Sequence, residues 1–170
     1  MVDVRCAKHI KFNNMSHISI YYHIIWRTKY SQLTIDEKNE RELYAYIHGF
    51  CKNKKSPLYR INGMPDHIHM LVSIHPSISV SSFMKVLKTE TSKWIKYSGL
   101  FSDFQGWGNG YACFSYSFQE KQNVYNYILN QKNHHQSEEM LTEVRRLFVD
   151  NGLDPDKDLF FKDDVEEDED

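Results

Sequence analysis

Two histidines separated by one residue, His67 and His69, are the side chains whose types and spacing first suggest chemistry. They open an alternating segment, His67 to Ile74, which follows a turn pattern of glycine, proline and aspartate at Gly63 to Asp66. Because side chains in a strand repeat every second residue, both imidazoles would point to one face of a sheet. Such a pair can bind a metal ion. Two strand histidines that only bind water or backbone groups are the alternative.

A tyrosine and a glutamine about 60 residues downstream form a second candidate group. Tyr127 and Gln131 are four positions apart in a helix predicted over about 120–134, so they share one face of it, and His134 and His135 follow one turn later. Two imidazoles and an amide oxygen would make an open, three-ligand site for Mg²⁺ or Mn²⁺, which also binds phosphate oxygens. A phenol with a pKa near ~10 needs such a cation or a base beside it to act as a nucleophile. Packing of the tyrosine against apolar neighbours is the alternative, and so is a helix-dipole role for the histidines.

The sequence predicts four strands and four helices that must position these groups. Alternating apolar residues of β-branched and aromatic types indicate the strands, and apolar residues at helical spacing indicate the helices. The order of the first six elements predicts an α+β fold with a ferredoxin-like βαββαβ antiparallel sheet. Two helices would cover one face of this sheet, and C-terminal helices carrying Tyr127 would reach the open face. The strands are expected at about 17–26, 58–62, 67–74 and 111–118, and the helices at about 36–54, 79–97, 120–134 and 137–149.

Local patterns predict where the helices begin and end. Thr34 to Glu37 has the spacing of a capping box, which places the start of the first helix near residue 36. Ser79 is predicted to cap the second helix, and Asn151-Gly152 to end the last one. The first strand has one apolar face and one more polar face, and His23 belongs to the more polar one.

The length of 170 residues and a content of 41% hydrophobic residues fit one globular domain with a sizeable core. We expect a single domain over 17–161, an N-terminal extension over 1–16 and a disordered acidic tail over 162–170. The last eight residues contain seven acids and no base, so the overall charge of -2 hides a body, residues 1–162, with 21 basic and 16 acidic residues. A basic body rich in tyrosine suits a nucleic-acid surface, although a charge of this size is also ordinary for solubility.

Cationic and aromatic residues are the candidates for DNA contacts. Three of them follow the first strand in a loop, where a phosphate contact would be natural. Lysines on the second helix and the two histidines after Gln131 complete the set, and a solvated helix face is the alternative for the lysines. The candidates are Arg27, Lys29, Tyr30, Lys85, Lys88, His134 and His135.

The cysteine content and the hydropathy pattern indicate a cellular compartment. Cys6, Cys51 and Cys113 have neither the number nor the spacing of a disulfide framework or a zinc knuckle. No apolar run approaches the ~20 residues that span a bilayer, and the N-terminus lacks the apolar stretch of a signal peptide. We therefore expect a cytoplasmic protein that has no membrane partner. If it acts on nucleic acid, as its basic body suggests, it would associate with the nucleoid when it acts.

Three motifs follow one another along the chain. They are Met64 to Val72, Gly106-Trp107 with Gly110 to Ser117, and Tyr127 to Gln131 with His134-His135. Together they closely resemble the motifs of the single-tyrosine HUH transposases of small insertion sequences with hairpin ends, and the resemblance covers about Ile18 to Phe161. In that family the loop after the first strand often reads Lys-Tyr-Arg or Lys-Asn-Arg, whereas Ser31 follows Lys29 and Tyr30 here.

This resemblance implies a dimeric DNA-strand transferase that acts on single-stranded DNA and recognises subterminal hairpins. By the resemblance, His67 and His69 are metal ligands, Gln131 is the third ligand, and the metal is Mg²⁺ or Mn²⁺. Tyr127 is then the nucleophile, which forms a 5′-phosphotyrosine and frees a 3′-OH. The family often combines the histidines of one subunit with the tyrosine helix of the other, so assembly in cis or in trans stays open.

Two other functions fit parts of the sequence. A single-stranded RNA- or DNA-binding module on the same sheet, without catalysis, would use Tyr21, Phe114 and Tyr116 as stacking platforms. A replication or plasmid-transfer nickase would use the same chemistry, but such proteins usually carry more domains.

Overall fold

A computed structural model describes residues 18–134, 140–157 and 160, apart from the side chains of residues 133 and 134. Its centre is a four-stranded sheet in the order β2-β3-β1-β4, in which every neighbouring pair is antiparallel. The α+β class and the βαββαβ order predicted from the sequence are confirmed. The strands are β1 (Tyr21–Arg27), β2 (Leu58–Met64), β3 (His67–Val72) and β4 (Ala112–Tyr116), and the main helices are α1 (Glu40–Asn53), α2 (Val80–Ser98), α3 (Lys121–Leu129), α4 (Gln131–His134) and α5 (Met140–Asp150).

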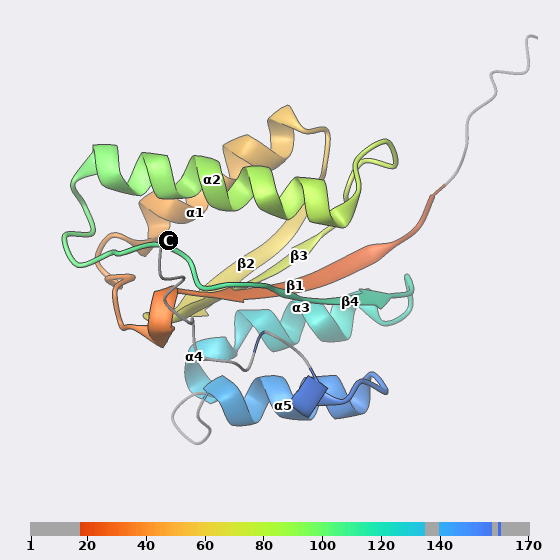
Figure 1. Cartoon of the computed structure of the whole chain (residues 1–170). Coiled ribbons are helices and arrows are strands. Elements are labelled where there is room, and N and C mark those ends of the chain that lie inside the picture. The colour runs from red at the N-terminus through yellow and green to blue at the C-terminus, as the bar shows by residue number, and fades with distance from the viewer. Residues whose placement is uncertain (1–17, 135–139, 158–159, 161–170) are drawn as a thin grey trace, which may run out of the picture.

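The sheet lies between two layers of helices (Figure 1). Helices α1 and α2 cover one face, where Ile24, Trp26 and Met70 of the sheet pack on apolar helix residues such as Leu43 and Phe83. Helices α3, α4 and α5 lie on the other face (Figure 1). There α3 packs on Tyr21 and Leu71, and α5 packs on Ile25 and Phe114. The predicted open face is therefore the face that receives the tyrosine helix.

The first helix begins later than the predicted capping box. It starts at Glu40 after Asn39, and no side-chain cap hydrogen bond is made there. The backbone N–H groups of Thr34 and Ile35 instead donate to the carbonyl of Pro65, at 2.9 and 2.8 Å. The capping-box prediction is wrong because these donors tie the segment to the turn between β2 and β3.

Other element ends follow the sequence more closely. The Ser79 hydroxyl caps α2 by accepting from the N–H of Ser82 at 3.2 Å, as predicted. Helix α5 ends at Asp150, and Gly152 follows in the left-handed region with φ 73°. The first strand is shorter than predicted, because Ile18 to Ile20 are described without sheet pairing.

The predicted helix over 120–134 is divided in two. Helix α3 ends at Leu129, and α4 begins at Gln131. The side-chain amide of Asn62 on β2 donates to the carbonyls of Ile128 at 2.9 Å and Leu129 at 3.3 Å. These bonds satisfy carbonyls at the end of α3 and bind the helix to the sheet.

Some of the sequence predictions fall outside the described residues. The N-terminal extension over 1–16 and the acidic tail over 162–170 lie there, so the domain boundaries stay predictions. In the part of the chain that the structure describes, no helix combines the length and the apolar character needed to cross a membrane.

Candidate metal and tyrosine site

The two histidines of β3 lie side by side on the sheet face that α3, α4 and α5 cover. His67 and His69 of β3 are opposite Arg27 and Ile25 of β1, and both histidines are fully buried. Their ring centroids are 5.0 Å apart. The alternation of β3 thus places both imidazoles on the face covered by α3 and α5, as the sequence predicts for a strand.

Each of these histidines has a polar partner on one ring nitrogen. The Nδ1 of His67 lies 2.6 Å from the Asp66 carboxylate, and the Nδ1 of His69 lies 2.9 Å from the Nε2 of His23. A proton on each Nδ1 leaves Nε2 as the nitrogen with a lone pair that can bind a metal ion. Asp66 and His23 therefore fix the orientation that metal binding requires.

The tyrosine helix brings its two predicted site residues to the same place within one chain. The Gln131 side chain is fully buried, and its Nε2 lies 3.1 Å from the Nε2 of His69. The Tyr127 ring centroid lies 6.2 Å from that of His69 and 5.9 Å from that of His23. The four residues singled out in the sequence, His67, His69, Tyr127 and Gln131, converge without a second subunit.

A fifth residue, Glu143 of α5, joins this group. Its side chain is 2% exposed, and its two carboxylate oxygens each accept a hydrogen bond from the Gln131 amide at 2.8 Å. The Tyr127 hydroxyl donates to the same carboxylate. One Glu143 oxygen also lies 3.9 Å from the Nε2 of His69. Glu143 thus contacts both the tyrosine and the residues around the histidine pair.

The donor set fits a divalent cation. Nitrogen atoms of His67 and His69 and a carboxylate oxygen of Glu143 lie within 4.8 Å of one another. The amide oxygen of Gln131 is buried and makes no hydrogen bond within the described residues. Two imidazole nitrogens with carboxylate and amide oxygens form a mixed donor set of the kind that binds divalent cations. This buried group could hold a metal ion.

Burial and the nearby carboxylate control protonation in the site. Burial lowers the pKa of His23 from 6.5 to about 4, and Glu143 opposes the shift. His23 is therefore neutral at pH 7 and can accept the His69 proton. Burial and then the Glu143 charge raise the pKa of Tyr127 well above its usual value, while Arg146 opposes this. The phenol is therefore protonated at neutral pH.

An ion pair outside the site binds the tyrosine segment to the opposite helix layer. The ammonium of Lys132, next to Gln131, lies 2.6 Å from the Glu40 carboxylate and 3.4 Å from that of Glu37. Together with Asn62, this contact fixes the segment from α3 to α4 against β2 and α1.

The candidate DNA contacts at the end of β1 have internal partners, and Arg27 is the last residue of the strand, not part of the following loop as predicted. Arg27 is 3% exposed, and its guanidinium donates to the Phe160 carbonyl at 3.2 Å and to the Ser31 hydroxyl at 3.3 Å. The Lys29 ammonium lies 4.9 Å from the ring centroid of Tyr30. A DNA role for these three candidates stays a prediction, and for Arg27 it would require loss of present contacts.

The other candidate DNA contacts are scattered. Lys85 and Lys88 belong to α2, and this helix lies across the sheet from α3, which carries Tyr127 (Figure 1). The Lys88 ammonium donates to the carbonyls of Gly108 at 2.5 Å and Gly110 at 3.0 Å, which holds the glycine-rich loop. The His134 side chain and the whole of His135 lie outside the description. The structure does not bring Lys85 and Lys88 into one surface with the tyrosine site.

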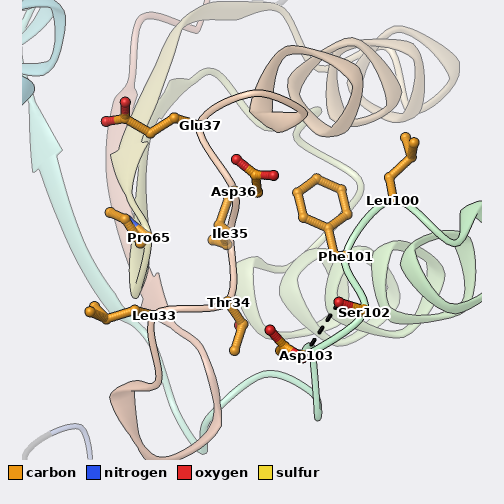
Figure 2. Close-up of a pocket in the computed structure, with 10 residues that line it drawn as sticks. All are labelled: Leu33, Thr34, Ile35, Asp36, Glu37, Pro65, Leu100, Phe101, Ser102 and Asp103. Carbon is orange, nitrogen blue, oxygen red and sulfur yellow. Dashed lines mark hydrogen bonds between the residues drawn. The ribbon is translucent and has the colours of Figure 1, made fainter.

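A surface hollow between the loop after β1 and the loop after α2 is a separate feature. Residues 33–37, Pro65 and residues 100–103 line it (Figure 2). Asp36, Glu37 and Asp103 contribute carboxylates to its lining. Like charges repel phosphate, so this hollow does not suit a nucleic-acid backbone.

The stacking platforms of the alternative binding module are mostly covered. Phe114 is 3% exposed and packs edge-to-face on Phe148 of α5, with ring centroids 5.5 Å apart. Tyr21 is 9% exposed beneath α3. A sheet-surface binder needs these rings to be accessible to bases, so the covered face does not favour this function.

Three residues of the site were not assigned a role from the sequence. Asp66 belongs to the predicted turn, and only the structure shows its carboxylate on the Nδ1 of His67. His23 was noted only as part of a polar strand face. Nothing in the sequence pointed to Glu143, which resembles any acidic residue on an amphipathic helix.

The fold and the site define a class: an α+β protein with a ferredoxin-like sheet, a buried His-x-His pair and a helix-borne tyrosine. The chain belongs to the IS200-like transposase family, because the family model described as "Transposase IS200 like" matches residues 16–131. The match ends at Gln131, so α5 and Glu143 lie beyond it.

Two curated relatives agree with this assignment. The transposase for insertion sequence element IS200 of Salmonella typhimurium LT2 is 32% identical over 92 residues, which cover 54% of this chain and 57% of that protein. The ISDra2 transposase TnpA of Deinococcus radiodurans is 24% identical over 115 residues, which cover 65% of this chain and 82% of that protein. The chain thus spans a little over half the length of the IS200 relative.

Two solved structures share the fold. A transposase candidate from Deinococcus radiodurans R1 superposes with a TM-score of 0.54 at 23% identity, over 68% of this chain and 93% of that one. A REP-associated tyrosine transposase bound to a REP hairpin gives a TM-score of 0.52 at 12% identity, over 89% of this chain and 91% of that one.

Proposed function

We propose that this protein is a metal-assisted transposase that cleaves and rejoins single-stranded DNA through a phosphotyrosine at Tyr127. One observation carries the proposal: the Tyr127 hydroxyl meets the buried group of His67, His69 and Glu143, together with Gln131, within one chain. Membership of the IS200-like transposase family supports a reaction on DNA.

The cation would be held by the Nε2 atoms of His67 and His69 and by an oxygen of Gln131 or Glu143. Mg²⁺ or Mn²⁺ bound there would polarise the scissile phosphate and neutralise charge that develops on its oxygens. Asp66 and His23 keep the two imidazoles in the orientation that binding requires.

The nucleophile is the Tyr127 oxygen. It attacks the phosphorus of the scissile phosphodiester, so that a bond forms between phosphorus and Oη while the bond to the 3′ oxygen breaks. The products are a 5′-phosphotyrosine and a free 3′-OH. Attack of a 3′-OH on the phosphotyrosine reverses the step and joins a strand, which conserves the energy of the phosphodiester.

The proposed partner is single-stranded DNA with hairpin ends. The basic body over residues 1–162 favours a polyanion, and a structural neighbour was solved with a REP hairpin. The contacts expected from Arg27, Lys29 and Tyr30 at the end of β1, and from Lys85 and Lys88 on α2, belong to this proposal. A homodimer belongs to it as well, because two element ends need two nucleophiles.

The test is a search for a covalent adduct. Purified protein is incubated with Mg²⁺ or Mn²⁺ and labelled single strands that carry the ends of the DNA flanking its coding region, and is then denatured and separated by electrophoresis. The parent protein should retain label, and Tyr127→Phe should not. Tyr125→Phe is the matched control, since Tyr125 lies on the same helix and faces Arg60 instead. An adduct that Tyr127→Phe forms as well as the parent would refute the proposal.

A further inference from the structure

Glu143 is a buried carboxylate that lies on the same side of α5 as the apolar residues of this helix. Met140, Val144, Leu147 and Phe148 of this helix are buried against the sheet, and position 143 lies on the same side. Removal of a carboxylate from water is unfavourable unless polar partners compensate. The partners supplied here are Tyr127 and Gln131, which both donate to it.

The two oxygens of Glu143 have different surroundings. Oε1 accepts from the Tyr127 hydroxyl, and Oε2 lies 3.9 Å from the Nε2 of His69. The carboxylate therefore stands between the nucleophilic oxygen and the histidine pair. Its contact with the phenol is a direct hydrogen bond.

The proposed reaction requires a group that removes a proton from Tyr127. A phenol attacks phosphorus effectively only as its O–H bond weakens, so a positioned base speeds the step. A tyrosine hydroxyl carries its proton at neutral pH, so the proton must leave during the reaction. A carboxylate that already accepts the hydrogen bond of this hydroxyl has the geometry of that base.

We infer that Glu143 is a catalytic residue, which holds the Tyr127 hydroxyl and takes its proton as the oxygen bonds to phosphorus. This inference rests on the proposed function. As the Oη–P bond forms, the proton passes to Glu143, the P–O3′ bond breaks, and the departing 3′ oxygen takes a proton from water. Glu143 then returns its proton to solvent, so charge and atoms balance. In strand joining the steps run in reverse: Glu143 takes a proton from solvent and gives it to the departing phenolate as the P–Oη bond breaks, while the attacking 3′-OH releases its proton to water.

The experiment compares Glu143→Gln and Glu143→Asp with the parent in single-turnover adduct formation at saturating Mn²⁺. Glutamine keeps the size and a hydrogen-bond acceptor but cannot take the proton, so the rate should fall by about 100-fold or more. Aspartate keeps the base and should retain more activity than glutamine. Asp150→Asn, an exposed carboxylate at the end of the same helix, should match the parent. Mn²⁺ affinity and circular dichroism are measured for each variant.

A fluorinated tyrosine at position 127 separates a base from a residue that only positions the ring. Fluorine makes the phenol more acidic with little change in shape, so the attack depends less on a base. Fluorotyrosine should raise the rate of adduct formation in Glu143→Gln by at least about 10-fold. It should change the rate of the parent by much less. The inference about Glu143 is overturned if Glu143→Gln reacts at the parental rate, or if fluorotyrosine does not raise its rate. Neither result contradicts the proposed function. A parent that forms no adduct at Tyr127 overturns the proposed function and the inference together.

Discussion

The hydroxyl of Tyr127 donates a hydrogen bond to the carboxylate of Glu143, a residue 16 positions further along the chain on a different helix. Tyr127 lies within the residues that match the IS200-like family, and Glu143 lies beyond them. The site therefore depends on a helix that follows the family core. Several expected outcomes test how its parts cooperate.

Asp66→Asn should weaken metal binding without removing a metal ligand. The Asp66 carboxylate lies 2.6 Å from the Nδ1 of His67 and holds that imidazole in one orientation. Loss of such an orienting partner typically costs about 10–100-fold in metal affinity. Titration calorimetry with Mn²⁺ measures the effect, with Asp103→Asn in the acidic hollow as the control. Equal affinities for Asp66→Asn and the parent would show that His67 needs no orienting carboxylate.

His23 should make the metal-free protein less stable in acid. Its pKa is about 4 in the folded protein against 6.5 as the ordinary value. The unfolded state therefore binds the extra proton between these values. The stability that His23 contributes is complete above pH 6.5 and is lost as the pH falls towards 4, with an amplitude of ~3 kcal/mol.

Urea unfolding of the parent and of His23→Phe across this pH window measures the contribution. As the pH falls from 6.5 to 4, the unfolding free energy of the parent should fall relative to that of the variant. His48→Gln, at an exposed position of α1, serves as the control and should follow the parent. A difference between parent and His23→Phe that stays constant with pH would contradict the expectation.

Asn62→Ala should destabilise the protein more than Lys132→Met does, although both residues bind the tyrosine segment. Asn62 is 9% exposed and donates to the carbonyls of Ile128 and Leu129, so its loss removes a donor from one buried and one partly buried carbonyl at a cost of about 1–3 kcal/mol. The Lys132 side chain is 36% exposed, and its ion pairs are worth about 0–1 kcal/mol. Chemical denaturation measures both. A larger loss in Lys132→Met would reverse this ranking.

Much of the fold followed from the sequence because its signals are local. Alternation over β1 and β3 and the Ser79 cap of α2 are set by neighbours in the chain. The start of α1 was misplaced because a contact with Pro65, about 30 residues away, overrides the local capping pattern.

The residues of the candidate site also fall into two groups: those that local sequence spacing predicts and those that only tertiary contacts identify. His67, His69, Tyr127 and Gln131 stand in motifs whose spacing can be read directly from the chain. The roles of His23 and Glu143 depend on which strand lies beside β3 and on which side of α5 faces the sheet. An isolated acidic residue in an amphipathic helix carries no sign of its eventual partners, so only the three-dimensional arrangement identifies it.

Phe148→Ala should affect both stability and the site, because Phe148 packs the helix that carries Glu143. Its side chain is 2% exposed and contacts Phe114 of β4 edge-to-face. Truncation of a buried phenylalanine costs about 3–5 kcal/mol, and a loosened α5 should hold Glu143 less firmly. The expected result is a lower unfolding free energy together with weaker Mn²⁺ binding and slower adduct formation.

The neighbouring Val149 provides the matched control for Phe148. It is 63% exposed on the same helix, so Val149→Ala should change stability by less than about 0.5 kcal/mol and leave Mn²⁺ affinity unchanged. Both variants are compared by calorimetry and adduct formation at a temperature where each is fully folded. If folded Phe148→Ala binds Mn²⁺ and forms the adduct as the parent does, the packing of α5 on β4 does not control the position of Glu143. If Mn²⁺ affinity and adduct formation fall in Phe148→Ala but not in Val149→Ala, the packing of α5 on β4 is required for the function of the site.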